Sequence, residues 1–182
     1  MFGLNKDEVK IVRYTKKWAN LYKQEEETLE KILKNFEFEI EHVGSTAIPG
    51  LSAKPIIDIA IGVDSIDIVK EVGKTLALYG YDLLDEIETK GQILARKGTD
   101  KCRTHYIHIV TLMSDRWINT NLFKRYLLEH PQTVKDYEKL KKQLAKKYKH
   151  ERTTYTANKN DFIQGVLKLA YKQYRGIDLD EE

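Results

Sequence analysis

The sequence contains one cysteine, Cys102, and only three prolines among its 182 residues. A single cysteine excludes an internal disulfide, and no cysteine–histidine spacing typical of a zinc site is present. No apolar run approaches the roughly 18 residues that a membrane-spanning helix needs. The first residues also lack the apolar core of a signal peptide. We therefore expect a cytoplasmic protein without a membrane partner.

Motifs of several common enzyme classes are also missing. The chain has no Walker loop, no dinucleotide-binding glycine pattern, no Gly-x-Ser-x-Gly elbow and no evident internal repeat. Its composition, 41% apolar and 32% charged, is that of a soluble globular protein. The length favours one domain over residues 1–182.

The net charge of +3 is unevenly distributed. Residues 121–175 hold 14 lysines and arginines against 5 acidic residues, whereas residues 176–182 hold 4 acidic residues and no basic one. A basic segment can attract phosphates or nucleic acid. No nucleic-acid-binding motif accompanies the charge, so we favour solvated helix faces and regard nucleic acid as the less favoured partner.

The most unusual residues lie in the stretch over residues 42–63. It starts with Gly44-Ser45-Thr46, passes through a Pro-Gly turn and enters an apolar strand. Small residues let the backbone approach a ligand closely, and N–H groups at such a turn can hold a phosphate. We therefore predict a phosphate-binding turn at Gly44, Ser45 and Thr46.

A single carboxylate, Asp58, interrupts the apolar strand over residues 56–63. Because strand side chains alternate, Asp58 shares its face with the small residues Ala60 and Gly62, and we expect open space above it. A carboxylate in an apolar strand is costly unless it is paired or bound to a metal. Either Asp58 accepts hydrogen bonds from a neighbouring turn, or it faces a ligand; we favour the ligand.

Together these residues resemble the signature of the GrpB family, also called UPF0157, and the resemblance covers nearly the whole chain. GrpB proteins are placed in the nucleotidyltransferase superfamily, whose pattern is Gly-Gly/Ser followed further along by Asp-apolar-Asp/Glu on a strand. The resemblance implies a minimal nucleotidyltransferase fold, a nucleotide or phosphorylated small molecule as ligand, and Mg²⁺ held by Asp58, with Mn²⁺ as the alternative. The matching residues are 42–51, Ala53-Lys54-Pro55 and Ile57-Asp58-Ile59.

One position departs from the superfamily pattern, because Ala60 stands where the second acid is expected. GrpB members often lack that acid, and two-metal chemistry usually needs it. Two functions therefore stay open: transfer of a nucleoside monophosphate, or binding of a nucleotide or phosphometabolite by an inactive module. Some relatives are fused to dephospho-coenzyme A kinase, which suggests a coenzyme A precursor or an adenine nucleotide by analogy. A protein that acts by binding a macromolecular partner is the least favoured hypothesis.

A β-hairpin is predicted over residues 92–97 and 102–111. Residues 103–108, Arg-Thr-His-Tyr-Ile-His, resemble a second GrpB motif, a histidine-rich strand. Nucleotidyltransferases carry a third acid on a strand beside the first, and none is available here. The resemblance thus makes His108 or His105 a candidate metal ligand, base or phosphate donor, with a structural role as the alternative.

Basic residues of this hairpin are candidate phosphate contacts, because a guanidinium fork suits phosphate oxygens. They are Arg103, Arg96 and Lys101. Lys54, just before the Asp58 strand, either contacts a ligand phosphate or pairs with Asp58.

His42 ends the apolar face of an alternating strand over residues 36–43, where it is either a hydrogen-bonded core residue or a residue that shapes the site. We name Asp58 as the catalytic residue and His108 as its helper.

The fold class is α/β (α+β). We expect a small mixed, mostly antiparallel sheet flanked by helices within residues 1–112, C-terminal helices over 113–175 and an acidic tail over 176–182. Ser65 and Ser114 are expected helix caps. Lys159 lies in a stretch that resembles a further family motif, and we favour its exposure to solvent over a reach into the site. Predicted helices cover residues 16–34, 65–79, 115–129, 132–149 and 158–174; predicted strands also cover 9–13 and 81–84, with a loop over 85–90.

Overall fold

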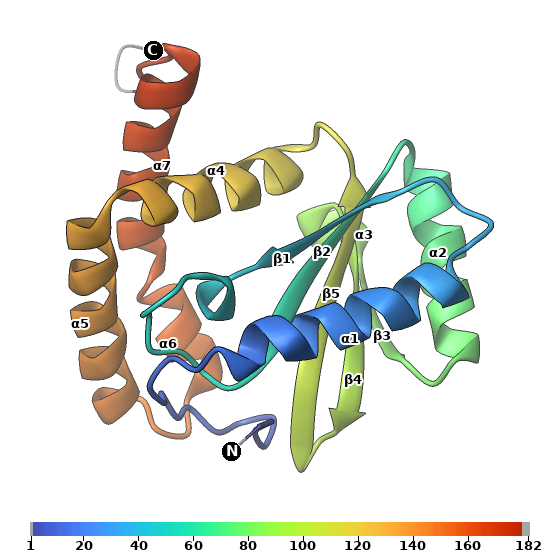
Figure 1. Cartoon of the computed structure of the whole chain (residues 1–182), viewed down its shortest axis with the longest axis horizontal. Helices are drawn as coiled ribbons and strands as arrows, with labels where there is room; N and C mark the ends of the chain where they lie inside the picture. The colour runs from blue at the N-terminus through green and yellow to red at the C-terminus, as the bar shows by residue number, and fades with distance from the viewer. Residues whose placement is uncertain (1, 180–182) are drawn as a thin grey trace.

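The computed structural model describes residues 2–179, and a five-stranded mixed sheet forms its centre (Figure 1). The order across the sheet is β1-β2-β5-β4-β3, with β2 and β5 parallel and the other neighbouring pairs antiparallel. The expected mixed, mostly antiparallel sheet is confirmed. The strands are β1 (Glu39–Val43), β2 (Ile57–Val63), β3 (Asp82–Glu86), β4 (Gln92–Thr99) and β5 (Cys102–Thr111).

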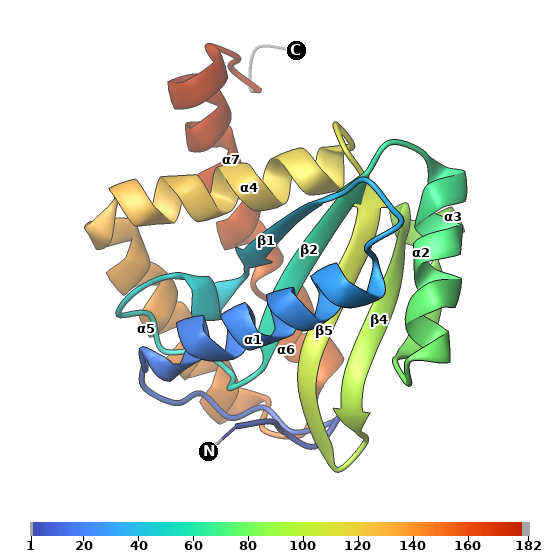
Figure 2. The same cartoon turned by 45° about the vertical axis from the view of Figure 1, so that its right-hand side comes forward.

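Helices α1 (Lys17–Ile32) and α2 (Ile66–Leu78) cover one face of the sheet (Figure 2). Trp18 of α1 and Leu76 of α2 are buried in one apolar cluster with Ile57, Ile59 and Ile107 of the central strands. Side chains alternate along a strand, so the residues between these isoleucines point to the opposite face. Asp58 is thereby directed away from the main core.

Helices α4 (Asp115–Glu129), α5 (Pro131–Lys147), α6 (Arg152–Ala157) and α7 (Asn160–Arg175) gather beside the β1 edge (Figures 1 and 2). Of these, α4, α5 and α7 pack on one another through apolar clusters that include Phe123, Tyr137 and Val166. The predicted caps are present, since the Ser65 and Ser114 side chains accept hydrogen bonds from backbone N–H groups of α2 and α4. Residues 113–175 are therefore helical as expected, with α6 as an addition.

Several predicted boundaries are wrong. β1 begins at Glu39 rather than at residue 36, because Phe36 and Phe38 instead pack on the main core in the connection from α1. Residues 9–13 form no strand and contribute one isolated bridge, Val12 to Ala53. The expected loop over 85–90 contains the end of β3 and the short helix α3 (Ile87–Lys90).

Two further expectations concern the chain end and the membrane. Residues 180–182 of the expected acidic tail lie outside the described residues. Within residues 2–179, no helix combines the length and the apolar character that crossing a bilayer requires.

Candidate functional site

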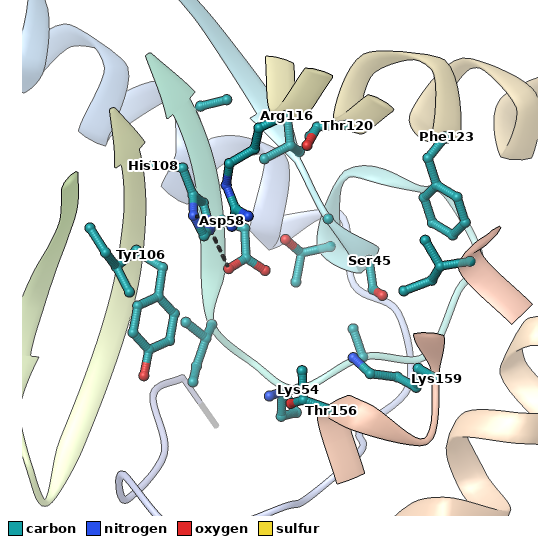
Figure 3. A pocket seen from close by; sticks show the side chains of 18 of the residues that line it. Ser45, Lys54, Asp58, Tyr106, His108, Arg116, Thr120, Phe123, Thr156 and Lys159 are labelled. Atoms are coloured by element: carbon teal, nitrogen blue, oxygen red, sulfur yellow. Dashed lines mark hydrogen bonds and ion pairs between the residues drawn. The ribbon is translucent and has the colours of Figure 1, made fainter. Parts of the chain in front are cut away.

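A cavity of about 930 Å³ lies on the face of the sheet opposite α1 and α2. Its floor is formed by β2 and β5, and its walls are formed by the one-turn helix η1 (Ser45–Ala47) and by residues of α4, α6 and α7. This volume is within the range of sites that hold small molecules. Figure 3 shows labelled side chains from β5, η1, α4 and α6 around Asp58 of β2, among them His108, Ser45 and Arg116.

The turn between β1 and η1 depends on Gly44. Its backbone angles, φ 69° and ψ −170°, lie in a region that is essentially restricted to glycine. A Cβ atom at this position would also lie 2.7 Å from Oδ2 of Asp58. The glycine therefore lets the backbone before Ser45 pass directly against the carboxylate, as expected for a close backbone approach.

Asp58 and His108 face each other across the two parallel strands. Oδ1 of Asp58 lies 3.8 Å from Nε2 of His108, and the Asp58 side chain remains 35% exposed (Figure 3). Burial acts to raise the pKa of Asp58, but the neighbouring His108 and the charges of Lys54 and Lys159 outweigh it and lower the pKa below its usual value. The carboxylate is therefore ionised at neutral pH.

The cavity above Asp58 extends over Ala60 but not over Gly62. Both Asp58 and Ala60 line the cavity. A Cβ atom on Gly62 would meet Leu112 at 2.4 Å and Trp117 at 3.0 Å. The expected open space is thus limited to the first half of β2, because α4 packs against the second half.

Three basic side chains gather at the start of β2. Lys54 and Lys159 lie on the ring of Tyr155, at 5.4 and 4.8 Å from its centroid, and Arg152 lies near Tyr106, with its guanidinium carbon 4.9 Å from that ring's centroid. All three line the cavity, and none forms an ion pair within residues 2–179.

The surroundings lower the pKa values of two of these lysines. For Lys54, burial and the charges of Arg152 and Lys159 lower the pKa to about 7. For Lys159, burial and the charge of Arg152 lower the pKa to about 8, although Asp58 opposes the shift. An anionic ligand in the cavity would offset the repulsion between these cations and raise the pKa values of both lysines.

Lys141 of α5 also lines the cavity. Its side chain is buried, and its Nζ donates a hydrogen bond of 2.5 Å to the carbonyl oxygen of Ser52. Burial and the nearby positive charges, Lys159 first among them, lower its pKa to about 6. Arg116 of α4 adds a further cation beside His108.

Seven of the sequence-predicted site residues line this cavity. They are Gly44, Ser45, Thr46, Lys54, Asp58, Arg96 and His108. The structure thus brings together the predicted turn, the carboxylate and one of the two histidines.

Arg103 and His105 lie on the opposite face of β5 and do not line the cavity. Alternation along the strand places them with Ile107 rather than with His108. Arg103 is buried and hydrogen-bonded to Asp100 and Gly98. Burial lowers the pKa of His105 to about 4, and its ring packs edge-on against Phe2. Their surroundings do not support the predicted phosphate contact.

His42 contacts the turn through Thr46. Its Nε2 lies 2.9 Å from Oγ1 of Thr46, and its ring stacks on Tyr22 with a centroid distance of 4.7 Å. Burial lowers its pKa to about 4, so the imidazole is neutral at physiological pH. Thr46 does line the cavity, and His42 therefore contacts the site through this residue.

No second acid of the described chain lines the cavity beside Asp58. Glu41 is the register partner of Ala60 on β1, but its carboxylate pairs with Lys124 at 2.7 Å. Glu86 is held by Lys90 and Gln92. Residues 2–179 also contain no group of three or more side chains suited to hold a metal ion.

The sequence did not predict the basic residues that come from the C-terminal helices, although the structure places them in the cavity. Lys159 was expected in solvent, and Arg116, Lys141 and Arg152 were not singled out. The one available signal was the likeness of the stretch around Lys159 to a family motif. These residues reach the cavity only through the packing of α4 to α7 on the sheet.

Comparison with solved structures first defines the class of fold. The Cid1 poly(U) polymerase bound to MgATP superposes with a TM-score of 0.51 at 18% identity, over 75% of this chain and 44% of that one. The chain therefore has a nucleotidyltransferase-like fold.

The family is defined by closer similarity. The family model described as GrpB protein matches residues 8–169. The glutamate-rich protein GrpB of Alkalihalophilus pseudofirmus is 38% identical over 92% of this chain and 98% of its own length. The crystal structure of the conserved protein GrpB from Enterococcus faecalis superposes with a TM-score of 0.81 at 34% identity, over 91% of this chain and 99% of that one. The chain belongs to the GrpB family.

One relative is longer. The UPF0157 protein YqkA of Bacillus subtilis is 34% identical over 94% of this chain, which spans only 50% of that protein.

Proposed function

We propose that the chain binds a nucleotide or another phosphate-bearing small molecule in the cavity. The observation that carries this proposal is the convergence of Lys54, Arg152 and Lys159 on a cavity whose described lining contains a single carboxylate, Asp58. Cations without ionic partners favour a ligand with several negative charges. The Gly44-Ser45 backbone and the Ser45 hydroxyl, which border Asp58, supply donors of the kind that hold phosphate oxygens.

The residues present fit a divalent cation that arrives with its ligand. Mg²⁺ often binds through one or two carboxylates together with substrate phosphates. Asp58 provides one ionised carboxylate, with His108 beside it, which is too little for a permanently held ion. Mg²⁺ or Mn²⁺ at Asp58 would neutralise phosphate charge when bound.

Transfer of a nucleoside monophosphate is the second candidate function. Asp58 lies on a strand directly beside the glycine turn, in a nucleotidyltransferase-like fold, and this arrangement favours transfer. Ala60 and the lack of a second acid in the described lining argue against it. Binding is therefore the conclusion that the geometry supports best, and a coenzyme A precursor or an adenine nucleotide remains the ligand suggested by analogy.

The test is the thermal stability of the wild type and of Asp58→Ala with a panel of nucleotides and coenzyme A precursors, each with and without Mg²⁺ or Mn²⁺. Asp64→Ala, an exposed aspartate at the end of the same strand, is the matched control. A ligand at 100 times its dissociation constant adds about 2.7 kcal/mol of stability. We expect a metal-dependent increase that Asp58→Ala removes and Asp64→Ala retains.

A turnover assay then separates the two candidate functions. A transferase releases pyrophosphate from a nucleoside triphosphate in an Asp58-dependent way, whereas a binding module returns its ligand unchanged. If no ligand of the panel stabilises the wild type, with or without Mg²⁺ or Mn²⁺, both candidate functions are overturned.

A further inference from the structure

A chain of hydrogen bonds leads from His108 away from the cavity. Nδ1 of His108 lies 3.0 Å from Oε1 of Gln92, and the Gln92 amide nitrogen donates to the Glu86 carboxylate. Gln92 is only 1% exposed, so water does not compete for either contact. Gln92 and Glu86 do not contact Asp58. Through His108, however, they determine whether the nitrogen that faces Asp58 carries a hydrogen.

Glu86 determines which group donates in each of these hydrogen bonds, because a carboxylate only accepts hydrogen bonds. Burial acts to raise the pKa of Glu86, but hydrogen bonds from Lys90 and Gln92 outweigh it and lower the pKa, so the group is ionised at neutral pH. The Gln92 amide nitrogen must therefore point to Glu86, and its oxygen must point to His108. That oxygen also only accepts, which requires a hydrogen on Nδ1 of His108.

We propose that Glu86 and Gln92 are positioning residues that hold neutral His108 in the tautomer with hydrogen on Nδ1. Nε2 is then unprotonated. It lies 3.8 Å from Oδ1 of Asp58, which is beyond hydrogen-bond distance, so the carboxylate does not accept a hydrogen bond from it (Figure 3). Imidazoles that bind metals commonly have their other nitrogen hydrogen-bonded in this way. His108 and Asp58 thereby offer one nitrogen and one oxygen ligand to the same space.

Arg116 makes the opposing demand on the same nitrogen. Its Nη2 lies 3.4 Å from Nδ1 of His108, and a guanidinium only donates, which would require the other tautomer. The Gln92 contact is the shorter of the two, and Glu86 leaves the Gln92 oxygen no other orientation. Assignment of the proton to Nδ1 leaves the Arg116 guanidinium available to an anionic group in the cavity.

The consequence for metal binding rests on the proposed function, whereas the tautomer itself does not. A nitrogen–oxygen pair binds Mn²⁺ and later transition metals more tightly than Mg²⁺. Loss of the hydrogen bond to the second ring nitrogen of a metal-binding histidine typically lowers the affinity for the metal by about 10- to 100-fold. Glu86→Gln should therefore weaken Mn²⁺ binding by about tenfold or more.

The direct test is long-range proton–nitrogen correlation NMR on the nitrogen-labelled full chain at about pH 8. The chain has five histidines, and His108→Gln identifies the signals of His108. We expect a protonated Nδ1 and an unprotonated Nε2 in the wild type. In Glu86→Gln, the Gln92 amide is free to turn, and the signals should move towards a mixture of tautomers.

Glu88→Gln is the matched control, because it removes the same charge from an exposed position two residues along. It should leave both the tautomer and the affinity for Mn²⁺ unchanged. A proton on Nε2 in the wild type, or an unchanged tautomer in Glu86→Gln, would overturn the positioning role. The predicted tautomer in a chain that binds neither Mn²⁺ nor phosphate would support the positioning role and overturn only the proposed function.

Discussion

Gly44→Ala should damage both the fold and the site, for two separable reasons. The first is backbone strain, because the φ and ψ values of Gly44 are essentially restricted to glycine, and a residue in such a region costs about 1–3 kcal/mol. The second is the approach of the new Cβ to 2.7 Å from Oδ2 and 3.1 Å from Cβ of Asp58. Since 1 kcal/mol shifts the melting temperature of a chain of this size by about 2–4 °C, strain alone should lower it by about 2–12 °C.

Gly50→Ala separates the two effects. Gly50 also has a positive φ, of 81°, but nothing lies within 4 Å of a Cβ atom built there. This variant should show strain alone, and it should retain ligand-induced stabilisation. Gly44→Ala should be the less stable of the two and should lose that stabilisation, because Asp58 is displaced.

A double-mutant cycle tests the contact itself. Asp58→Ala removes the carboxylate that the new Cβ meets, so the destabilisation by Gly44→Ala should be smaller in the Asp58→Ala background. Thermal and urea unfolding of the four proteins measure this coupling. If Gly44→Ala is no more destabilising than Gly50→Ala, or if the two substitutions are additive, the reasoning on the close approach is refuted.

Three further predictions follow from the charges of the chain. Binding of inorganic triphosphate at about pH 7.5 should take up protons, because the anion raises the lowered pKa values of Lys54 and Lys159. Calorimetry in two buffers of different ionisation enthalpy measures this proton uptake. The absence of proton uptake would argue against contacts between the anion and these lysines. Without ligand, stability should rise as the pH rises from about 6 to 9, because the pKa of Lys141 is about 6 in the folded chain against 10.5 ordinarily, so the unfolded chain binds more protons in this window. Lys141→Met should flatten that rise in urea unfolding, and an equal slope in both proteins would contradict the account. Tyr81→Phe should lower the free energy of unfolding by about 1.5–3 kcal/mol, because the Tyr81 hydroxyl donates to the buried Glu25 carboxylate at 2.6 Å; a loss below 0.5 kcal/mol would be too small for a hydrogen bond to a buried charge.

Local patterns were sufficient to predict most of the fold. The apolar run interrupted by Asp58 predicted β2, the alternation of strand side chains predicted the face that the carboxylate shares, and Ser65 and Ser114 predicted the starts of α2 and α4. The likeness to the GrpB signature supplied the fold class. Boundaries failed where tertiary contacts decide, as at Phe36 and Phe38, whose alternation suggested strand but whose side chains close the connection after α1.

The site could be predicted only in part. The residues near one another in sequence, from Gly44 to Asp58, were found because the turn and the strand are local features. Arg103 was proposed from residue type and His105 from the likeness to the second GrpB motif, although alternation places both on the face opposite His108. Lys159 could not be placed, because its position depends on how α6 and α7 pack against the sheet, which no local pattern encodes.

The central claim is that the cations of this cavity hold phosphate, and titration calorimetry with inorganic triphosphate tests it most directly. A charge-assisted hydrogen bond contributes about 1.5–3 kcal/mol, which corresponds to about a tenfold or greater change in affinity. Lys159→Met should therefore weaken binding by about tenfold or more. Lys139→Met, at an exposed position on α5, should not change it. Equal affinities in all three proteins, or no binding by the wild type, would contradict the account.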